Sequence, residues 1–418
     1  MESIKPFPKE EGLDHSLSLL REGYLFVTSR ADAFQSDLFE TRLLGERAVC
    51  MRGEEAAELF YDNSKFKRHG AAPKRVLKTL LGETGVQTLD GEEHRHRKAM
   101  FMSLMNRGAL VRMRAIVGKQ WMLAAGRWEA EQEINLYEEA QLLLCRAACE
   151  WAGVPLDAGE AGQKAEWLAA MYESPASLGM TYIKGRRSRR KAEKWIGELV
   201  DSVRAGTLHP PEGAALHTIA LHRDLKGELL ETKTASVEVL NILRPIVAVA
   251  VYIAFAALAV IQQPQEKARL ASSDEDALKN FVQEVRRFYP FFPFSPARAV
   301  KDFEWGGYKF HEGMLVLLDL YGTNHHPRLW SSPALFQPDR FREWSGSPFR
   351  FVPQGGGDHD AGHRCAGEWI TLEIMKESLD FLANKLRFEV PEQDVSFSFG
   401  EMPSLPHSRI RLQKVRAL

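Results

Sequence analysis

The sequence predicts a mainly α-helical fold that also contains small β-sheets. Apolar residues recur at helical spacing in most of the long segments, whereas the strand-like segments are short. The longest apolar run, residues 246–261, is shorter than the roughly twenty residues that a membrane span needs, so we expect a buried core helix there. The 418 residues contain no internal repeat, low-complexity segment or flexible linker. Residues 1–418 are therefore expected to form one domain.

Composition excludes some classes of function. The formal net charge of −1 argues against a general electrostatic surface for nucleic acid. The four cysteines lack disulfide-rich spacing, which fits a reduced, cytoplasmic compartment. Residues 1–14 are polar and acidic, so we expect neither a signal peptide nor a membrane anchor. The basic run 186–191 is predicted to open a helix and to form its solvated face; the alternative is a surface for a partner or for incoming substrate.

The predicted elements follow in chain order. Short strands are expected at 24–28 and 47–51. Helical patterning covers 54–61, 92–105, 136–151, 192–203, 232–261 and 275–288. Strand signals return at 297–300 and 314–318. A long segment rich in Pro, Gly, Asp and Trp, 324–362, then precedes a helix at 366–383 and two strands at 387–390 and 409–412.

An irregular segment of this length inside a compact domain is unusual and is often functional. Residues 354–357 near its end read Gln-Gly-Gly-Gly, and Cys365 follows, directly before the predicted helix. Gly362 and Gly367 flank the cysteine and allow the backbone to approach a flat ligand closely. The end of this segment is therefore a candidate functional loop that leads directly into Cys365.

The residues alone leave several roles open for Cys365. The positive end of the following helix, together with His363 and Arg364, is expected to favour the thiolate form. A free cysteine is usually a small buried hydrophobe. A nucleophile would need a base partner, and a haem ligand is a further option. Zinc is poorly supported, because the sequence has no Cys-x-x-Cys or His-Glu-x-x-His spacing.

Two further motifs precede the cysteine in a defined order. Glu284 and Arg287 form Glu-x-x-Arg, one helical turn apart on one helix face. Residues 336–341 then read Phe-x-Pro-x-Arg-Phe. This order, completed by the glycine-rich loop, the cysteine and a helix, resembles the C-terminal half of the cytochrome P-450 superfamily. The resemblance implies the P-450 fold, with haem between the long central helix and the cysteine loop, and a structural triad of Glu284, Arg287 and Arg340 behind the haem.

The resemblance also implies the cofactor and the residues that bind it. The cofactor would be haem b, with the thiolate of Cys365 as the axial ligand of the iron. Residues 296–298 stand where the family often has a propionate-binding arginine, and 94–98 resemble its His-x-x-x-Arg helix with lysine in the arginine place. The residues expected to bind the cofactor are Cys365, His94, Lys98, Arg298, His363 and Arg68.

Two departures from the common family pattern narrow the function. Phe351 lies fourteen residues before Cys365, so the ligand loop is lengthened. Most P-450 monooxygenases carry an acid–alcohol pair at the centre of the long helix, which delivers protons during oxygen activation. Residues 240–261 contain no such pair, and Arg244 is their only charged residue.

Arg244 is followed by Pro245, which removes a helix hydrogen bond and can kink the helix. An arginine near a helix start ordinarily reaches solvent. Here apolar residues follow on all faces of the helix, so we expect an interior side chain, and a buried arginine needs an anion. The Arg-Pro pair resembles the bacterial fatty-acid peroxygenase branch of the family. Similar segments at 39–44, 53–57, 59–62 and 354–358 extend this resemblance over nearly the whole chain.

This branch implies a peroxygenase that acts on long-chain fatty acids with hydrogen peroxide and has no obligatory redox partner. Arg244 would hold the substrate carboxylate by paired, charge-assisted hydrogen bonds, and this carboxylate would act as the acid and base. The anchor would direct oxidation to the α and β carbons, giving 2- and 3-hydroxy acids, or terminal alkenes after loss of carbon dioxide. The alternatives are a redox-partner-dependent monooxygenase and a haem-binding sensor without turnover.

The remaining predicted site residues would surround the substrate. Gln87 stands where the branch has Gln or His above the haem, and Gln favours hydroxylation because decarboxylating relatives tend to have His. Arg244, Pro245 and Gln87 are thus the expected catalytic residues. The pocket residues implied by the resemblance are Leu81, Leu178, Phe291 and Phe292, and ordinary core packing is an equal alternative for each. Leu81 stands where relatives often have Phe.

Overall fold

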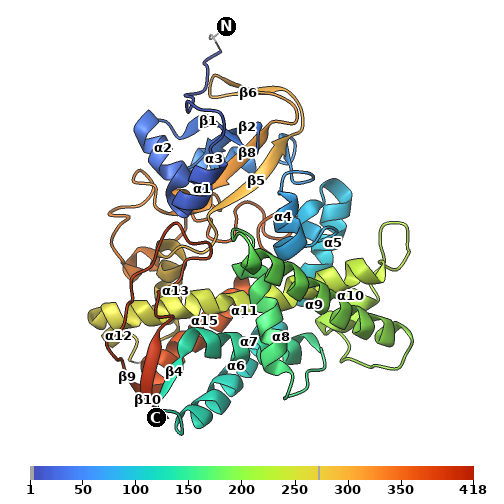
Figure 1. Cartoon of the computed structure of the whole chain (residues 1–418), viewed down its shortest axis with the longest axis vertical. Helices are drawn as coiled ribbons and strands as arrows, with labels where there is room; N and C mark the ends of the chain where they lie inside the picture. Colours follow the sequence, from blue (N-terminus) through green and yellow to red (C-terminus); the bar gives the residue numbers. More distant parts are fainter. Residues whose placement is uncertain (1–3, 272–273) are drawn as a thin grey trace.

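A computed structural model describes residues 4–271 and 274–418. A β-rich region lies beside the N-terminus, next to a larger body of helices that contains the C-terminus (Figure 1). The helices are α1 (Ser16–Glu22), α2 (Phe26–Phe34), α3 (Glu54–Phe60), α4 (Lys74–Val76), α5 (Gly91–Leu104), α6 (Arg107–Trp128), α7 (Leu136–Ala152), α8 (Ala161–Glu173), α9 (Met180–Arg204), α10 (Ala215–Ala220), α11 (Thr232–Gln262), α12 (Pro264–Arg269), α13 (Glu275–Phe288), α14 (Leu320–Asn324) and α15 (Glu368–Asp380). Shorter helical turns are η1 (Gly23–Leu25), η2 (Leu77–Leu81), η3 (Val86–Thr88), η4 (Pro338–Phe341) and η5 (Phe381–Lys385).

The strands form three small sheets. They are β1 (Leu38–Leu43), β2 (Glu46–Met51), β3 (Phe66–Lys67), β4 (Glu133–Asn135), β5 (Phe294–Ala299), β6 (Phe303–Trp305), β7 (Tyr308–Phe310), β8 (Leu315–Asp319), β9 (Leu386–Glu389) and β10 (Arg411–Ala417). The largest sheet has the order β1-β2-β8-β5-β3, in which β2 and β8 are parallel and the other pairs antiparallel. The other sheets are β4-β10-β9 and β6-β7.

The largest sheet is covered on both faces because its strands alternate two sets of apolar side chains. One set, which includes Val49 and Val316, packs against α3. The other set, which includes Cys50 and Leu317, packs against α2. This arrangement corrects the strand expected at 24–28, which is helical. Its aromatic and β-branched side chains, Phe26 among them, cover the sheet instead of extending it.

Helix α11 is the axis of the helical body (Figure 1). Nearly every side chain from 235 to 260 is buried, against α7, α8, α9, α13 and α15 among others. Among the described residues it alone is long and apolar enough to cross a membrane, but 83% of its most apolar window lies inside the protein. The buried core helix expected at 246–261 is therefore confirmed, and Pro245 lies within a helix that continues on both sides.

Most of the predicted helices and strands are present with small shifts at their ends, and the mainly α-helical fold with small sheets is confirmed. The basic run 186–191 does not open a helix, because α9 already begins at Met180. The sequence analysis did not single out α6 and α8. Between α14 and Cys365, only the single turn η4 interrupts the predicted irregular segment.

Candidate active site

Cys365 stands between the glycine-rich loop and α15. Its backbone N–H donates to the carbonyl oxygen of Gln354 at 3.1 Å, and the side-chain Nε2 of Gln354 donates to Sγ at 3.8 Å. Burial raises the pKa of the Cys365 thiol, while the ammonium of Lys98 and the backbone N–H of Gly367 oppose this rise. The protein environment alone therefore does not hold the thiolate, and a bound metal cation is what would deprotonate this sulfur.

The basic neighbours of Cys365 are paired, contrary to the expected positive flank. Arg364 Nε donates to Glu368 at 2.6 Å, and the buried Arg286 donates to the same carboxylate at 2.6 Å. His363 Nε2 lies 3.5 Å from Asp90, and burial lowers the pKa of His363. Pairing thus neutralises the positive charge that the sequence placed beside the sulfur.

Helix α5 brings two more predicted cofactor residues to this loop. Lys98 is buried and its ammonium donates to the carbonyl oxygen of Arg364, one residue before the cysteine. His94 stacks on His363 with ring centroids 3.9 Å apart. Burial, followed by the charges of His363 and Lys98, lowers the pKa of His94 to about 3. His94 is therefore a neutral hydrogen-bonding group at neutral pH.

Arg68 lies beside this histidine pair and lacks a full set of partners. Its Nη2 donates to the carbonyl oxygen of Phe60 at 3.2 Å, and its guanidinium lies over the Phe60 ring. Its Nη1 is buried without a hydrogen-bond partner. Burial lowers the pKa of Arg68 to about 10, and no carboxylate hydrogen-bonds to its guanidinium in the part of the chain described. A buried cation of this kind needs an anion.

Arg298 has a different environment from the other predicted cofactor residues. Both of its terminal nitrogens donate to Glu46, at 2.9 and 3.0 Å. Its Nε donates to the carbonyl oxygen of Gly70 at 2.7 Å. The guanidinium is therefore already paired at the edge of the sheet. Its propionate role stays a prediction.

Arg244 lies in α11, directly before Pro245. The residue is 6% exposed, its Nη1 is buried, and its guanidinium has no hydrogen-bond partner among the described residues. Burial, followed by the like charge of Arg189, lowers the pKa of Arg244 to about 9, while the charge of Cys365 acts in the opposite direction. The structure therefore presents an interior cation that lacks an anion.

The predicted pocket residues fall into two groups. Leu81 is partly buried against the core, and Phe291 stacks on Tyr252 of α11 with ring centroids 4.1 Å apart. Leu178, in contrast, is 67% exposed in the loop before α9, and Phe292 is also exposed. Leu81 and Phe291 thus pack against the core and Leu178 and Phe292 lie at the surface, and the pocket role of all four stays a prediction.

Gln87 lies in η3 and meets α11 one turn before Arg244. Its Oε1 accepts a hydrogen bond from Asn241 Nδ2 at 3.2 Å. Asn241 also donates to Glu238 at 2.9 Å, and Glu238 is paired with Arg97 at 2.7 Å. Asn241 therefore contacts Gln87 one helical turn before Arg244.

The buried triad predicted from Glu-x-x-Arg is present. Glu284 accepts from Arg287 at 2.7 and 2.8 Å and lies 3.1 Å from Arg340. Arg287 also donates to the carbonyl oxygens of residues 324, 333 and 335. One buried guanidinium thus ties α13 to the irregular segment that leads to the cysteine.

Comparison with known proteins decides the family. A family model described as "Cytochrome P450" matches residues 270–413. The solved structure of cytochrome P450EX alpha (CYP152N1) with myristic acid is 52% identical, covers 99% of this chain and 100% of its own, and has a TM-score of 0.96. This chain belongs to the CYP152 family of cytochrome P450 enzymes, the fatty-acid peroxygenases.

Other relatives place this CYP152 enzyme within the superfamily. Cytochrome P450SP alpha (CYP152B1) in complex with (R)-ibuprophen is 44% identical over 97% of this chain and 99% of its own, with a TM-score of 0.95. Cytochrome P450 OleT, ligand-free, is 36% identical over 98% and 99%, with a TM-score of 0.96. Beta-amyrin 28-monooxygenase of Barbarea vulgaris is 23% identical over 90% of this chain and 85% of its own. The likeness is therefore much stronger within CYP152 than outside it.

The described residues of this CYP152 enzyme fit a haem. A haem brings a cationic iron and two propionate carboxylates. Gln354 and the backbone N–H of Gly367 contact the sulfur of Cys365, and burial raises the pKa of this thiol. A bound metal ion would lower the pKa again, as it does for a thiol ligand. The orphaned Nη1 of Arg68, beside His94 and Lys98, matches a carboxylate. Haem-thiolate binding follows from the family, and the individual contacts stay predictions.

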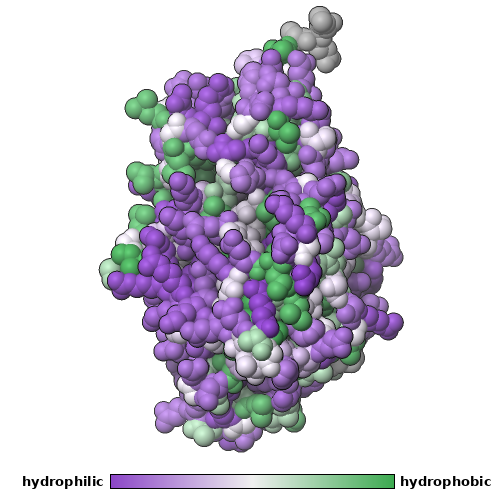
Figure 2. All heavy atoms as spheres, turned by 90° about the vertical axis from the view of Figure 1, so that its right-hand side faces the viewer, coloured by the Kyte–Doolittle hydropathy of each residue, from purple (hydrophilic) through white to green (hydrophobic). Residues whose placement is uncertain are grey.

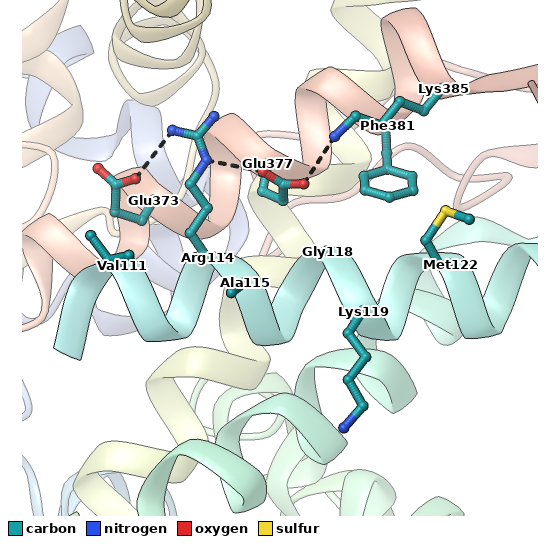
Figure 3. A pocket seen from close by; sticks show the side chains of 10 residues that line it. All are labelled: Val111, Arg114, Ala115, Gly118, Lys119, Met122, Glu373, Glu377, Phe381 and Lys385. Atoms are coloured by element: carbon teal, nitrogen blue, oxygen red, sulfur yellow. Dashed lines mark hydrogen bonds and ion pairs between the residues drawn. The ribbon is translucent and has the colours of Figure 1, made fainter. Parts of the chain in front are cut away.

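A cavity of about 650 Å³ elsewhere in the CYP152 enzyme does not match the substrate (Figure 3). It lies between α6 and α15, and Figure 3 shows Arg114 and Lys385 directed at acidic side chains of α15. Arg114 pairs with Glu377 at 3.0 Å, and Lys385 pairs with it at 3.1 Å. Lys119, the third basic residue of its lining, pairs with Glu150 at 3.0 Å, so each lysine and arginine in the lining already has an acidic partner.

Sequence reasoning missed the residues that support the predicted ones. Gln354 and Arg286 hold the cysteine loop, since Arg286 donates to Gln354 Oε1 at 2.9 Å. Glu238 and Asn241 hold Gln87. One signal was available in the sequence for the second pair: Glu238, Asn241 and Arg244 recur at three-residue spacing in an otherwise apolar helix.

Proposed function

We propose that this enzyme uses hydrogen peroxide to hydroxylate long-chain fatty acids at the α carbon, the β carbon or both, with some decarboxylation to terminal alkenes. The observation that carries the proposal is Arg244, an interior cation without an anion in a helix that has no acid of its own from 240 to 261. A fatty acid supplies both missing parts, the anion and the acid. The relative cytochrome P450EX alpha was solved with myristic acid, which supports this substrate class.

Arg244 binds the carboxylate in this proposal. Its planar guanidinium presents two parallel N–H donors, which suit both carboxylate oxygens at once. The bound anion offsets the burial that lowers the pKa of Arg244 to about 9, so the arginine stays charged when substrate is present. Pro245 follows directly and leaves the carbonyl of residue 241 without its helix donor, which loosens the helix at this point.

The substrate carboxylate takes the role of the absent acid–alcohol pair. Held by Arg244, it accepts a proton and returns it, as a general acid and base does. Cys365, His94, Lys98, Arg298, His363 and Arg68 would hold haem b, which would supply peroxide activation and oxygen transfer. The anchored head group leaves only the first carbons of the chain beside the haem, so oxidation falls on the α and β positions.

The proposal extends to the setting of the enzyme. We infer one P450 domain over residues 1–418, a cytoplasmic location, and turnover without an obligatory redox partner, nucleic acid or membrane span. The chain belongs to a family whose members use hydrogen peroxide, and this supports turnover without a redox partner.

Product analysis with myristic acid and hydrogen peroxide tests the function. We expect 2- and 3-hydroxymyristic acid, and tetradecanol of equal chain length should not react because it brings no carboxylate. Turnover that requires a reductase and a reduced nicotinamide cofactor would instead indicate a redox-partner-dependent monooxygenase. Tight fatty-acid binding without any product would indicate a sensor.

A further inference from the structure

A row of polar groups runs inward along α11 and ends at Gln87. Glu238 is 0% exposed, and its Oε1 accepts from Arg97 Nη1 of α5 at 2.7 Å. Its Oε2 accepts from Asn241 Nδ2 at 2.9 Å. The same Nδ2 donates to Gln87 Oε1 at 3.2 Å. Arg244 follows one turn after Asn241 on the same face of the helix.

The chemistry of these groups fixes which way each amide points. An ionised carboxylate only accepts hydrogen bonds, and both oxygens of Glu238 already face donors. Asn241 must therefore turn its NH₂ group towards Glu238. The second hydrogen of this NH₂ group is donated to Gln87, so Gln87 must present its carbonyl to Asn241. Its own NH₂ group then points away from Asn241.

The contact between Asn241 and Gln87 is also tightly packed. A Cβ at Gly85 would lie 2.8 Å from Asn241 Nδ2, from Gln87 Oε1 and from the Leu81 carbonyl oxygen. The backbone at Gly85 therefore lies against this contact and leaves no room for a side chain. The backbone N–H of Val86 also donates to Glu238. Asn241 Oδ1 is buried without a partner, so the described hydrogen bonds hold this amide through its NH₂ group alone.

We propose that Glu238 and Asn241 are positioning residues that lock the side-chain amide of Gln87 with its NH₂ group facing the substrate carboxylate, and thereby set the ratio of α to β oxidation. This proposal rests on the proposed function of the same site. A carboxylate bound to Arg244 is an acceptor, so a donor at Gln87 attracts it and a carbonyl there would repel it. A second contact on the carboxylate fixes its rotation about the arginine, and this rotation decides which carbon lies beside the haem.

The experiment is a double-mutant cycle between Asn241 and Gln87. Asn241→Leu removes the donor, Gln87→Leu removes the amide that it positions, and the double variant combines them. Glu238→Gln leaves the shape unchanged, but an amide at 238 allows Asn241 to turn either way. The matched control is Ser236→Ala, on the same helix, because the buried Ser236 hydroxyl bonds only to the carbonyl oxygen of Lys233 at 2.8 Å.

Four quantities are measured for each variant: the ratio of 2- to 3-hydroxymyristic acid, the dissociation constant of myristic acid from the haem spectrum, the melting temperature, and the Gln87 side-chain position in a crystal structure. We expect Asn241→Leu and Glu238→Gln to change the product ratio and the dissociation constant by roughly 2- to 10-fold, the worth of one net hydrogen bond. In the Gln87→Leu background, Asn241→Leu should have no further effect on the ratio. Ser236→Ala should resemble the wild type.

The outcomes separate this proposal from the function on which it rests. Equal effects of Asn241→Leu on the product ratio with and without Gln87 would overturn the proposal, because Asn241 would then not act through Gln87. An unchanged ratio together with a lowered melting temperature would also overturn it, since the row would be structural only. A wild-type enzyme that gives no hydroxy acid with peroxide would instead refute the proposed function.

Discussion

Two buried arginines, Arg287 and Arg244, have opposite surroundings. Arg287 is 0% exposed and is paired with Glu284 at 2.7 and 2.8 Å, with three backbone carbonyls around it. Arg244 is almost as deeply buried, yet no described side chain or carbonyl bonds to its guanidinium. A buried cation with an internal partner stabilises the fold, whereas one without a partner costs stability and is available to a ligand. The same contrast separates Arg298, which is paired, from Arg68, whose Nη1 is not.

The first prediction concerns the paired side of this comparison. Glu284→Ala should lower the free energy of unfolding by roughly 3–5 kcal/mol, because Arg287 and Arg340 lose their shared anion. The variant should be recovered with little haem. The measurements are thermal unfolding and haem content. The control is Asp339→Ala, an exposed partner of Arg269 in the same region, whose loss should cost at most about 1 kcal/mol. Full haem content and an unchanged melting temperature in Glu284→Ala would show that the paired arginines do not depend on Glu284.

The second prediction concerns the unpaired side. Arg244→Ala should leave the melting temperature unchanged or raise it, because an unpartnered charge is removed. Its kcat/KM for myristic acid should fall by roughly 10²- to 10³-fold, since the enzyme–substrate ion pair is lost. Arg244→Lys sharpens the test, because it retains the charge and some binding but loses the fork and most of the rate. A wild-type rate in Arg244→Ala would refute the carboxylate anchor.

The third prediction concerns Arg68. Arg68→Ala should weaken haem retention by roughly 10- to 150-fold, because a charged hydrogen bond to a propionate contributes roughly 1.5–3 kcal/mol. Haem loss to an excess of an apo haem acceptor measures this directly. An unchanged rate of haem loss would mean that the unpaired Nη1 of Arg68 does not face the cofactor.

The fourth prediction concerns Gln87. Gln87→His should raise the alkene fraction, since an imidazole can donate or accept a proton beside the carboxylate and an amide cannot. Asn241 would donate to one ring nitrogen and leave the other N–H directed at the substrate. Chromatography of alkene and hydroxy acids from one reaction gives the ratio. If the ratio stays that of the wild type, position 87 does not control the partition.

The smallest effect is expected at Arg298. Arg298→Ala removes a partly exposed ion pair with Glu46, which should cost at most about 1 kcal/mol. Because Arg298 is already paired, its loss should weaken haem retention less than the loss of Arg68 does. Melting temperature and the haem-transfer assay used for Arg68 measure both quantities. Haem loss as fast as in Arg68→Ala would show that Arg298 contributes as much as Arg68 to holding the haem, although it is paired with Glu46.

The sequence predicts well where a single chain segment determines the answer. The order of motifs located Cys365, the triad of Glu284, Arg287 and Arg340, and the buried position of Arg244. Each of these depends on spacing within a helix or on a contiguous motif. The interior position of Arg244 followed from the apolar residues around it, because such a helix has no solvated face.

Prediction was poorer where distant segments meet. The contacts that hold Gln87 join residues 154 positions apart, and those between Arg286 and Gln354 join residues 68 apart, so no local pattern reveals them. Segment 24–28 has the composition of a strand but forms helix because its apolar side chains cover the sheet. Leu178 occupies a family position, yet its exposure depends on how the loop before α9 folds.

The three carbonyl contacts of Arg287 also bear on the order of events as the chain folds. Arg287 lies in α13, whose backbone hydrogen bonds are local. Its three carbonyl partners, in contrast, lie 37, 46 and 48 residues further along the chain. Closing loops of this length takes place after local helix formation. We therefore expect residues 324–362 to order after α13 and as a unit, and the cysteine loop at the end of this segment to order with them.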